Sequence, residues 1–198
     1  MLHKQQKGQT MIEAVVAVGI LLAGVTALIT LSIATLKADQ ISSRKIVAIN
    51  LAREALEVAR NVRDSNWLAG RHDDCSGTLA DDTDNWFYGL EGQPFGSCGV
   101  VPTEYFPQLE TVSGVLTFER VADPLDKDVY LTSAGLYNQD LLTPVGTKTI
   151  YRRWVTVAPQ TISSPKINYV DLTAHVEYTL DNRIHSVELA TRLYNWKP

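Results

Sequence analysis

Glu13 is the residue whose chemistry most constrains this chain, because it lies inside a long apolar stretch. It is the only charged residue within residues 11–36, and the other 25 residues there are apolar, Gly, Thr or Ser. A carboxylate in the apolar core of a membrane costs about 3 kcal/mol, so such residues normally have a partner. We therefore expect Glu13 either to meet a partner or, since it stands near the start of the stretch, to reach a membrane interface.

The stretch around Glu13 is long enough to cross a bilayer. About 20 apolar residues span the hydrocarbon core as a helix, and residues 11–36 exceed that number. A short segment with Lys4 and Lys7 precedes them, which places residues 1–8 on the cytoplasmic side by the positive-inside tendency. An ordinary secretory signal peptide does not fit, because its apolar core has only about 7–15 residues and an Ala-x-Ala-like cleavage site follows it.

The sequence contains no pattern of an enzyme active site. Gly-x-Ser-x-Gly, a phosphate-binding glycine loop and His-Glu-x-x-His are all missing. His72 adjoins two aspartates in a polar region, and we expect His175 and His185 on the solvent side of strands. We therefore predict neither catalysis nor a metal centre.

The charge balance argues against a nucleic-acid-binding protein. The chain has 18 basic and 22 acidic residues and a formal charge of -4, which does not suit bulk attraction of polyanions. Tyr151, Arg152, Arg153 and Trp154 are a candidate for DNA contacts, because arginines beside aromatic rings suit phosphates and bases. The same residues also suit a strand with arginines on one face and aromatics in the core, and we do not predict DNA binding.

The helical pattern continues beyond the apolar stretch into a soluble segment. No Gly or Pro occurs within residues 25–67, so we expect one helix over about residues 10–64. Its second half has an apolar stripe at three- and four-residue steps, which needs a partner surface. A coiled coil is one alternative, but the many alanines favour close packing on a sheet. The stripe consists of Ile41, Ala48, Leu51, Ala52, Ala55, Ala59 and Val62.

The rest of the chain has the patterns of a long loop followed by strands. Gly, Asp, Ser and Asn are frequent within residues 68–110, where we expect Trp86, Phe87 and Tyr88 to anchor the loop to the head. Asp181 and Asn182 form a turn signal between two alternating segments, which predicts an antiparallel hairpin. The predicted strands are residues 112–121, 149–158, 168–179 and 183–196, and Pro159 is expected to end the second of them. Residues 130–137 are a predicted short strand with a turn around Gly135.

These patterns predict an α+β protein with a long N-terminal helix packed on an antiparallel β-sheet head. We divide the chain into a basic leader at residues 1–8, an apolar helix at 9–36, its amphipathic continuation at 37–67 and a β-rich head at 68–198.

The segment that runs from Gly8 through Glu13 into the apolar stretch resembles the class III signal of type IV pilins and pseudopilins. The short basic leader, Gly8, Thr10 and Glu13 match the family's spacing, and residues 52–67 also resemble a recurring run in such sequences. The resemblance implies cleavage by a prepilin peptidase between Gly8 and Gln9, N-methylation of Gln9, and assembly through Glu13 and Thr10. The family usually begins its mature chain with Phe or Met, where this sequence has Gln9, and it often has a helix-breaking proline that is missing here.

The resemblance implies a structural subunit, not an enzyme, with a single membrane pass and an extracytoplasmic head that becomes part of a surface filament. The implied partners are prepilin peptidase, other pilin subunits and an assembly platform in the cytoplasmic or inner membrane. We favour a minor pilin of a type IV pilus-like filament. A minor pseudopilin of a type II secretion system is the alternative within the family, and an uncleaved signal-anchored surface binding protein is the alternative outside it.

Two further expectations depend on export of the head. Cys75 and Cys98 stand near the two ends of the long loop, and an oxidising compartment would allow a disulfide between them worth about 3 kcal/mol. Some pseudopilins bind calcium in head loops, but the two aspartate clusters here do not match an EF-hand. We expect solvated loop charges there and no cofactor. The clusters are Asp81, Asp82 and Asp84, and Asp123, Asp126 and Asp128.

Overall fold

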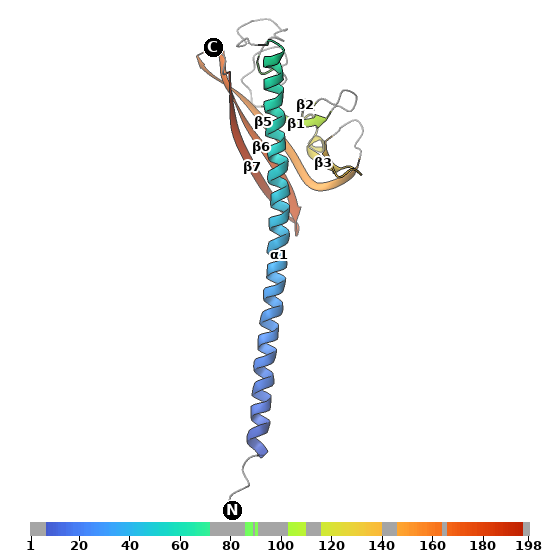
Figure 1. Ribbon diagram of the computed structural model, residues 1–198, viewed down its shortest axis with the longest axis vertical. Coiled ribbons are helices and arrows are strands. Elements are labelled where there is room, and N and C mark those ends of the chain that lie inside the picture. The colour runs from blue at the N-terminus through green and yellow to red at the C-terminus, as the bar shows by residue number, and fades with distance from the viewer. Residues whose placement is uncertain are drawn as a thin grey trace, which may run out of the picture. The chain divides into compact units, whose positions relative to one another are not determined.

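The described residues form one long helix, a short 3-10 helix and a seven-stranded antiparallel sheet, so the predicted α+β class is confirmed (Figure 1). The computed structural model describes residues 7–71, 86–88, 90, 103–109, 116–139, 146–163 and 166–195. The elements are α1 (Lys7–Leu68), β1 (Thr103–Leu109), β2 (Leu116–Arg120), a 3-10 helix η1 (Pro124–Lys127), β3 (Asp128–Leu131), β4 (Tyr137–Asn138), β5 (Thr147–Ser163), β6 (Lys166–Leu180) and β7 (Arg183–Tyr194).

Two compact units divide the chain, and the boundary falls inside α1. Unit 1 is Met1–Arg44, and its described part is the N-terminal portion of the helix. Unit 2 is Lys45–Pro198 and contains the C-terminal portion of α1 together with the sheet. Within the described residues, α1 is one helix whose length and composition suit a membrane span.

Helix α1 ends in a Schellman motif, which explains why the helix stops at Leu68. Gly70 has a φ of 82°, a left-handed value that glycine adopts without a side-chain clash. The Gly70 N–H donates to the carbonyl of Trp67 over 3.1 Å, and the Arg71 N–H donates to that of Asn66 over 2.9 Å. These two bonds satisfy carbonyls that would otherwise lack a donor at the helix end.

The sheet is built around the long strand β5. Its neighbours are β1 and β3 on one side and β6 on the other, and β2, β4 and β7 complete the sheet. Strands β6 and β7 form the predicted hairpin, with twelve consecutive residue pairs from Tyr169↔Tyr194 to Leu180↔Arg183. Asp181 and Asn182 adopt φ values of 50° and 58°, as a two-residue type I′ turn requires.

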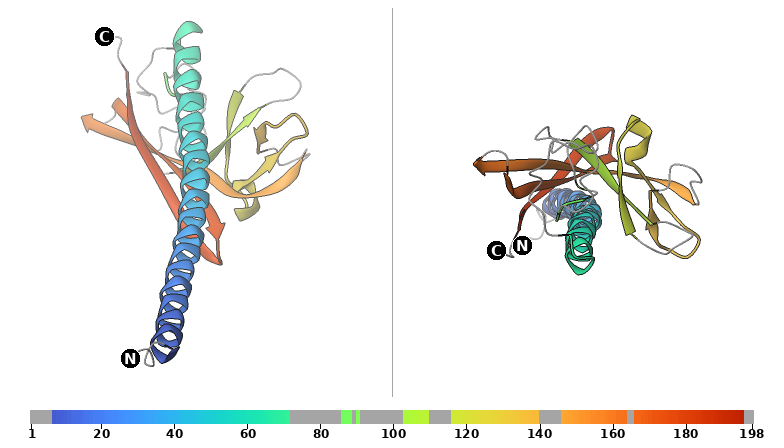
Figure 2. Two further views of the ribbon diagram at one scale, coloured as in Figure 1. Left: turned by 60° about the horizontal axis from the view of Figure 1, so that its bottom comes forward. Right: turned by 90° about the horizontal axis from the view of Figure 1, so that it is seen from above.

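In unit 2, the alanine stripe of α1 packs on one face of the sheet, as the sequence predicted (Figure 2). Small side chains allow the helix backbone to approach the sheet closely, and four alanines are fully buried: Ala48, Ala52, Ala55 and Ala59. The facing row of β6 is fully buried as well, with Val170, Leu172, Ala174 and Val176 at 0 % exposure. Ile41 was assigned to the same stripe, but this residue is 41 % exposed in unit 1.

The end of β5 and the start of β1 differ from the predicted boundaries by several residues. Pro159 does not end β5, which continues to Ser163. The pairing of β5 with β1 stops at Val157. At Pro159 only β6 pairs with β5, so one side of β5 is an edge there. A residue without a backbone N–H is tolerated at such an edge. The predicted loop at residues 68–110 also ends early, because β1 begins at Thr103. Pro107 lies inside β1 and obscured its strand pattern.

Three residues anchor the connecting region between α1 and β1. Trp86, Phe87 and Leu90 are fully buried, so the predicted role of the aromatic cluster is confirmed for the first two. Asn66 near the end of α1 holds this segment, because its side-chain amide donates to the carbonyls of Trp86 over 3.3 Å and Tyr88 over 2.8 Å.

Candidate functional site

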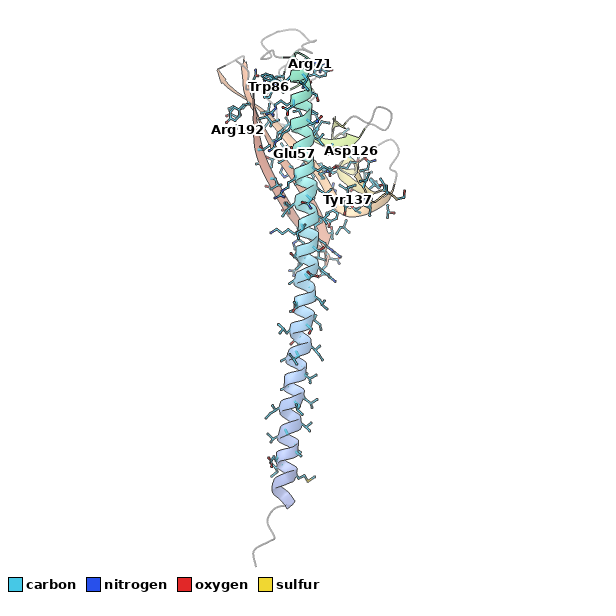
Figure 3. All side chains as sticks on the ribbon, in the orientation of Figure 1. Glu57, Arg71, Trp86, Asp126, Tyr137 and Arg192 are labelled. Carbon is cyan, nitrogen blue, oxygen red and sulfur yellow. The ribbon has the colours of Figure 1, made fainter. Side chains whose placement is uncertain are left out.

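The apolar portion of α1 in unit 1 is the first candidate site. Its large apolar side chains project to all sides of the helix and are at least half exposed, from Ile33 at 50 % to Met11 at 74 % (Figure 3). Exposure of so many large apolar side chains to water would be strongly unfavourable, so this segment needs hydrocarbon or other helices around it.

Three threonine hydroxyl groups in this segment are satisfied by the helix itself. Thr26, Thr30 and Thr35 each donate to a carbonyl three or four residues earlier, over 2.7–3.0 Å. Glu13 is exposed and, unlike these threonines, has no partner within the described part of the chain. No ion pair or hydrogen bond joins its side chain to another described residue. The carboxylate therefore depends on something outside the described part of the chain for compensation in an apolar setting.

The predicted processing residues lie at the beginning of the same helix. Gly8, Gln9 and Thr10 have helical backbone in α1, which begins at Lys7, and their side chains lie outside the described residues. The predicted scissile bond after Gly8 therefore belongs to the first helical turn, where helix ends fray. Cys75, Cys98 and the cluster of Asp81, Asp82 and Asp84 lie outside the described residues, so the disulfide remains a prediction.

A buried arginine in unit 2 is the second candidate site, and no local sequence pattern predicted its role. The Arg153 side chain on β5 is only 2 % exposed and forms an ion pair with Glu54 of α1, with 3.0 Å between Nη1 and Oε2. The same nitrogen donates to the carbonyl of Leu51 over 3.2 Å. Arg153 thus joins the sheet directly to the helix backbone and to one helix side chain.

Gln139 completes the polar surroundings of Arg153. Its Oε1 accepts from Arg153 Nε over 2.7 Å, and its Nε2 donates to the carbonyl of Arg153 over 2.9 Å. The same Nε2 also lies 3.2 Å from the carbonyl of Asp126 and 3.3 Å from that of Lys127. We call Arg153, Glu54 and Gln139 the helix–sheet clamp, because their contacts connect α1, β5 and the segment that contains η1.

The electrostatics of the clamp depend on Glu54. Burial lowers the pKa of the Arg153 guanidinium, and the charge and hydrogen bond of Glu54 oppose that shift. Arginine remains charged in proteins even so. A buried cation whose anionic partner is removed leaves an uncompensated charge, which is far more costly than loss of an exposed pair.

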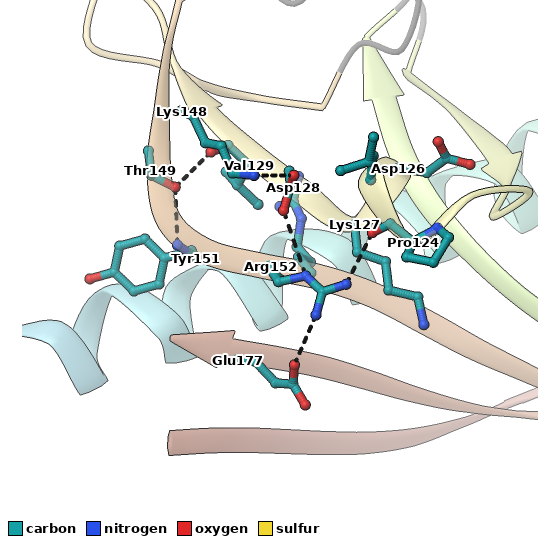
Figure 4. Close-up of polar contacts among 12 residues, drawn as sticks. Pro124, Asp126, Lys127, Asp128, Val129, Lys148, Thr149, Tyr151, Arg152 and Glu177 are labelled. Carbon is teal, nitrogen blue, oxygen red and sulfur yellow. Dashed lines mark hydrogen bonds and ion pairs between the residues drawn. The ribbon is translucent and has the colours of Figure 1, made fainter. Parts of the chain in front are cut away.

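A second ionic network lies around Asp128 and accounts for one aspartate cluster (Figure 4). The carboxylate of Asp128 is 4 % exposed and lies 2.6 Å from Lys148 Nζ and 3.6 Å from Arg152 Nε. The hydrogen bond with Asp128 is the main cause of a raised pKa for Lys148. Arg152 also reaches Glu177 over 3.6 Å and donates to the Pro124 carbonyl over 3.0 Å.

The other two aspartates of this cluster have structural roles. Asp123 caps η1 by accepting from the Leu125 N–H, and Asp126 accepts from the N–H groups of Ala122 and Asp123. The described residues contain no group of three His, Cys, Asp or Glu side chains that could hold a metal ion. The carboxylates of Asp123, Asp126 and Asp128 are thus engaged by backbone and cations of the chain itself.

The candidate nucleic-acid patch is dispersed by the sheet. Arg153 points into the core while Arg152 faces the opposite side and belongs to the Asp128 network. Trp154 is stacked on His175, with 5.1 Å between ring centroids, and Lys127 Nζ lies 4.2 Å from the Trp154 ring. Both arginines and the tryptophan are therefore occupied by contacts within the chain.

Comparison with known proteins does not extend this description, because no protein-family model, curated protein or solved structure matches the chain.

Replacement of Glu54 by Ala tests the clamp. We expect Glu54→Ala to lower the free energy of unfolding by about 2 kcal/mol, because Arg153 stays buried without its anion. The value is below that of a fully buried pair since the Glu54 side chain is 47 % exposed and water replaces part of the interaction.

Glu57→Ala is the matched control for denaturant unfolding of the full chain in detergent micelles. Its side chain is 65 % exposed and pairs with Arg60 on the helix surface, so its loss should cost less than about 1 kcal/mol. Equal effects of the two substitutions would show that Arg153 does not depend on Glu54.

Proposed function

We propose that this chain is a structural subunit of a type IV pilus-like filament, and within that class we favour a minor pilin. In this proposal prepilin peptidase cuts after Gly8, and the N-terminal half of α1 then packs with the helices of other subunits. The chain has no catalytic activity of its own in this proposal. The observation that carries it is a single carboxylate, Glu13, within an exposed apolar segment and five residues after Gly8.

The charge of Glu13 is compensated differently in a bilayer and in a filament. In a bilayer the carboxylate has no counter-charge and costs free energy. In a filament, the new amino terminus of a neighbouring subunit supplies the opposite charge, and attraction between the two is strong in a low-dielectric core. Assembly therefore relieves a cost that exists before assembly, and the pair fixes the axial register of neighbouring helices.

The proposal also includes a location for the chain before and after assembly. Before assembly it is a single-pass membrane protein with an extracytoplasmic head, held by the platform of the cytoplasmic or inner membrane. After assembly it is part of a cell-surface filament with a role in adhesion or secretion. A minor pseudopilin would share every feature used here, whereas an uncleaved surface anchor would need neither Gly8 nor Glu13.

Processing at Gly8 separates the proposal from a plain anchor. When the chain is made with an active, matched prepilin peptidase, intact mass and N-terminal sequencing should give a mature chain that begins at Gln9. We expect Gly8→Val to block cleavage, because the resemblance makes glycine the stricter requirement at this bond.

Gly19→Val is the control for processing, since an added Cβ at Gly19 meets no atom within 4 Å and the change leaves the cleavage motif intact. A wild-type chain that still begins at Met1 despite an active peptidase would contradict the proposal and favour the surface anchor.

The register role of Glu13 has its own test. Glu13→Ala should be processed normally but should enter filaments at less than about one tenth of the wild-type level. We expect the substitution to remove more than about 1.4 kcal/mol of docking free energy, and each 1.4 kcal/mol changes the equilibrium tenfold. Immunoblots of sheared filaments against the membrane fraction measure this ratio.

Glu57→Ala removes a carboxylate from the other half of α1 and should be incorporated like the wild type. Normal incorporation of Glu13→Ala would show that this residue has no assembly role.

A further inference from the structure

The free edge of β7 is the longest unpaired strand edge in the part of the sheet that the structure describes. Strand β7 pairs with β6 on one side, and no described strand lies on its other side. It has 12 residues, whereas the other edge strands, β2 and β4, have 5 and 2. An edge strand of this length presents a long row of backbone N–H and C=O groups to its surroundings.

Strand β7 has few of the features that normally prevent an edge from pairing. Natural edges are shortened, bent by bulges, or protected by Pro, Lys and inward-pointing charges. The sequence of β7 contains no Pro and no Lys, and its pairing with β6 runs without a shift in register. The charged residues of β7 are Arg183 at its first position, Glu188 and Arg192, and from His185 to Leu193 the row that faces α1 contains no Asp, Glu, Lys or Arg.

The side chains on the α1 side of β7 are incompletely covered. Val187 and Leu189 are half-buried against the core cluster, whereas the neighbouring β6 residues Ala174 and Val176 are fully buried. Val187 and Leu189 therefore keep part of their apolar surface exposed, on the strand that forms this edge of the sheet. A further strand with apolar side chains at alternate positions would cover this surface.

The charged residues on the outer face of β7 favour a basic residue in any strand that pairs with this edge. Arg192 is held by both carboxylate oxygens of Asp171, at 2.6 and 3.0 Å. Glu188 Oε1 lies 3.2 Å from His175 Nδ1, and the Glu188 side chain is 62 % exposed. Opposite charges directly across a strand pair are favourable, so a basic residue opposite Glu188 suits this edge.

We propose that the free edge of β7 binds an extended segment of a partner protein by β-augmentation. The segment adds a strand to the sheet and places alternate apolar side chains beside Val187 and Leu189. Its other face is polar and carries a Lys or Arg opposite Glu188. Main-chain hydrogen bonds supply binding, and the alternation and the basic residue supply selectivity. The inference stands on the head alone and does not depend on cleavage or filament assembly.

A synthetic peptide tests the edge directly. The probe is a capped nine-residue peptide with Val at alternate positions and Thr or Lys between them, added to the full chain in detergent micelles. We expect alternate β7 amides to gain protection from hydrogen exchange, measured by NMR, because only every second residue of an edge strand points its backbone groups outward. A peptide of the same composition without the alternation should give no protection.

Two substitutions identify the residues that recognise the probe. Val187→Lys introduces an inward-pointing charge and should weaken binding at least about tenfold. Ile150→Lys is the control, because Ile150 is 42 % exposed on β5, which is not an edge partner of β7. Glu188→Lys should weaken binding of the Lys peptide and favour a peptide that carries Glu in its place.

Three results would overturn the proposal. The first is no protection of β7 at millimolar peptide, and the second is binding that Val187→Lys and Glu188→Lys leave unchanged. The third is full protection of both sets of β7 amides without peptide. If that protection depended on protein concentration, a second copy of the chain would occupy the edge; if it did not, another segment of the same chain would.

Discussion

The constraint on which the rest of the structure depends is that one helix must satisfy two different environments. In unit 1, α1 exposes large apolar side chains on all sides, so it is stable only where water is excluded. In unit 2, the same helix buries a stripe of small side chains against a sheet and exposes charged residues elsewhere. The change between the two patterns occurs without a proline or glycine between Val25 and Trp67, so both patterns belong to one helix.

Attachment of the sheet to α1 combines close packing with one buried ion pair. The alanines bring the helix near to β5 and β6, and this proximity allows Arg153 to reach Glu54 and the Leu51 carbonyl from β5. Buried ion pairs add little net stability but penalise wrong arrangements, because a displaced partner leaves a charge without compensation. In our account the clamp therefore sets which face and which turn of the helix the sheet occupies, while apolar burial supplies most of the free energy.

The sequence predicted those parts of the fold that local rules determine. The alanine stripe, the alternation of β6 and the turn at Asp181 and Asn182 were readable because each depends on side-chain period or turn chemistry. The Arg153 clamp was not, because Arg153 and Glu54 are 99 positions apart and no local pattern links them. Ile41 continued the helical period, but a period does not reveal where the covering sheet ends. Processing at Gly8 and the pairing of Glu13 remain predictions, since their partners are other molecules.

The most direct test of the central claim measures the surroundings of the two halves of α1. Nitroxide labels at Leu22→Cys and Asn50→Cys, in a chain with Cys75→Ser and Cys98→Ser, would be compared in lipid vesicles by collision with oxygen and with a water-soluble nickel complex. The account predicts that the label at position 22 is accessible to oxygen and shielded from nickel, and that the label at position 50 shows the reverse. Equal access of the nickel complex to both labels would show that the apolar segment lies in water and would contradict the account.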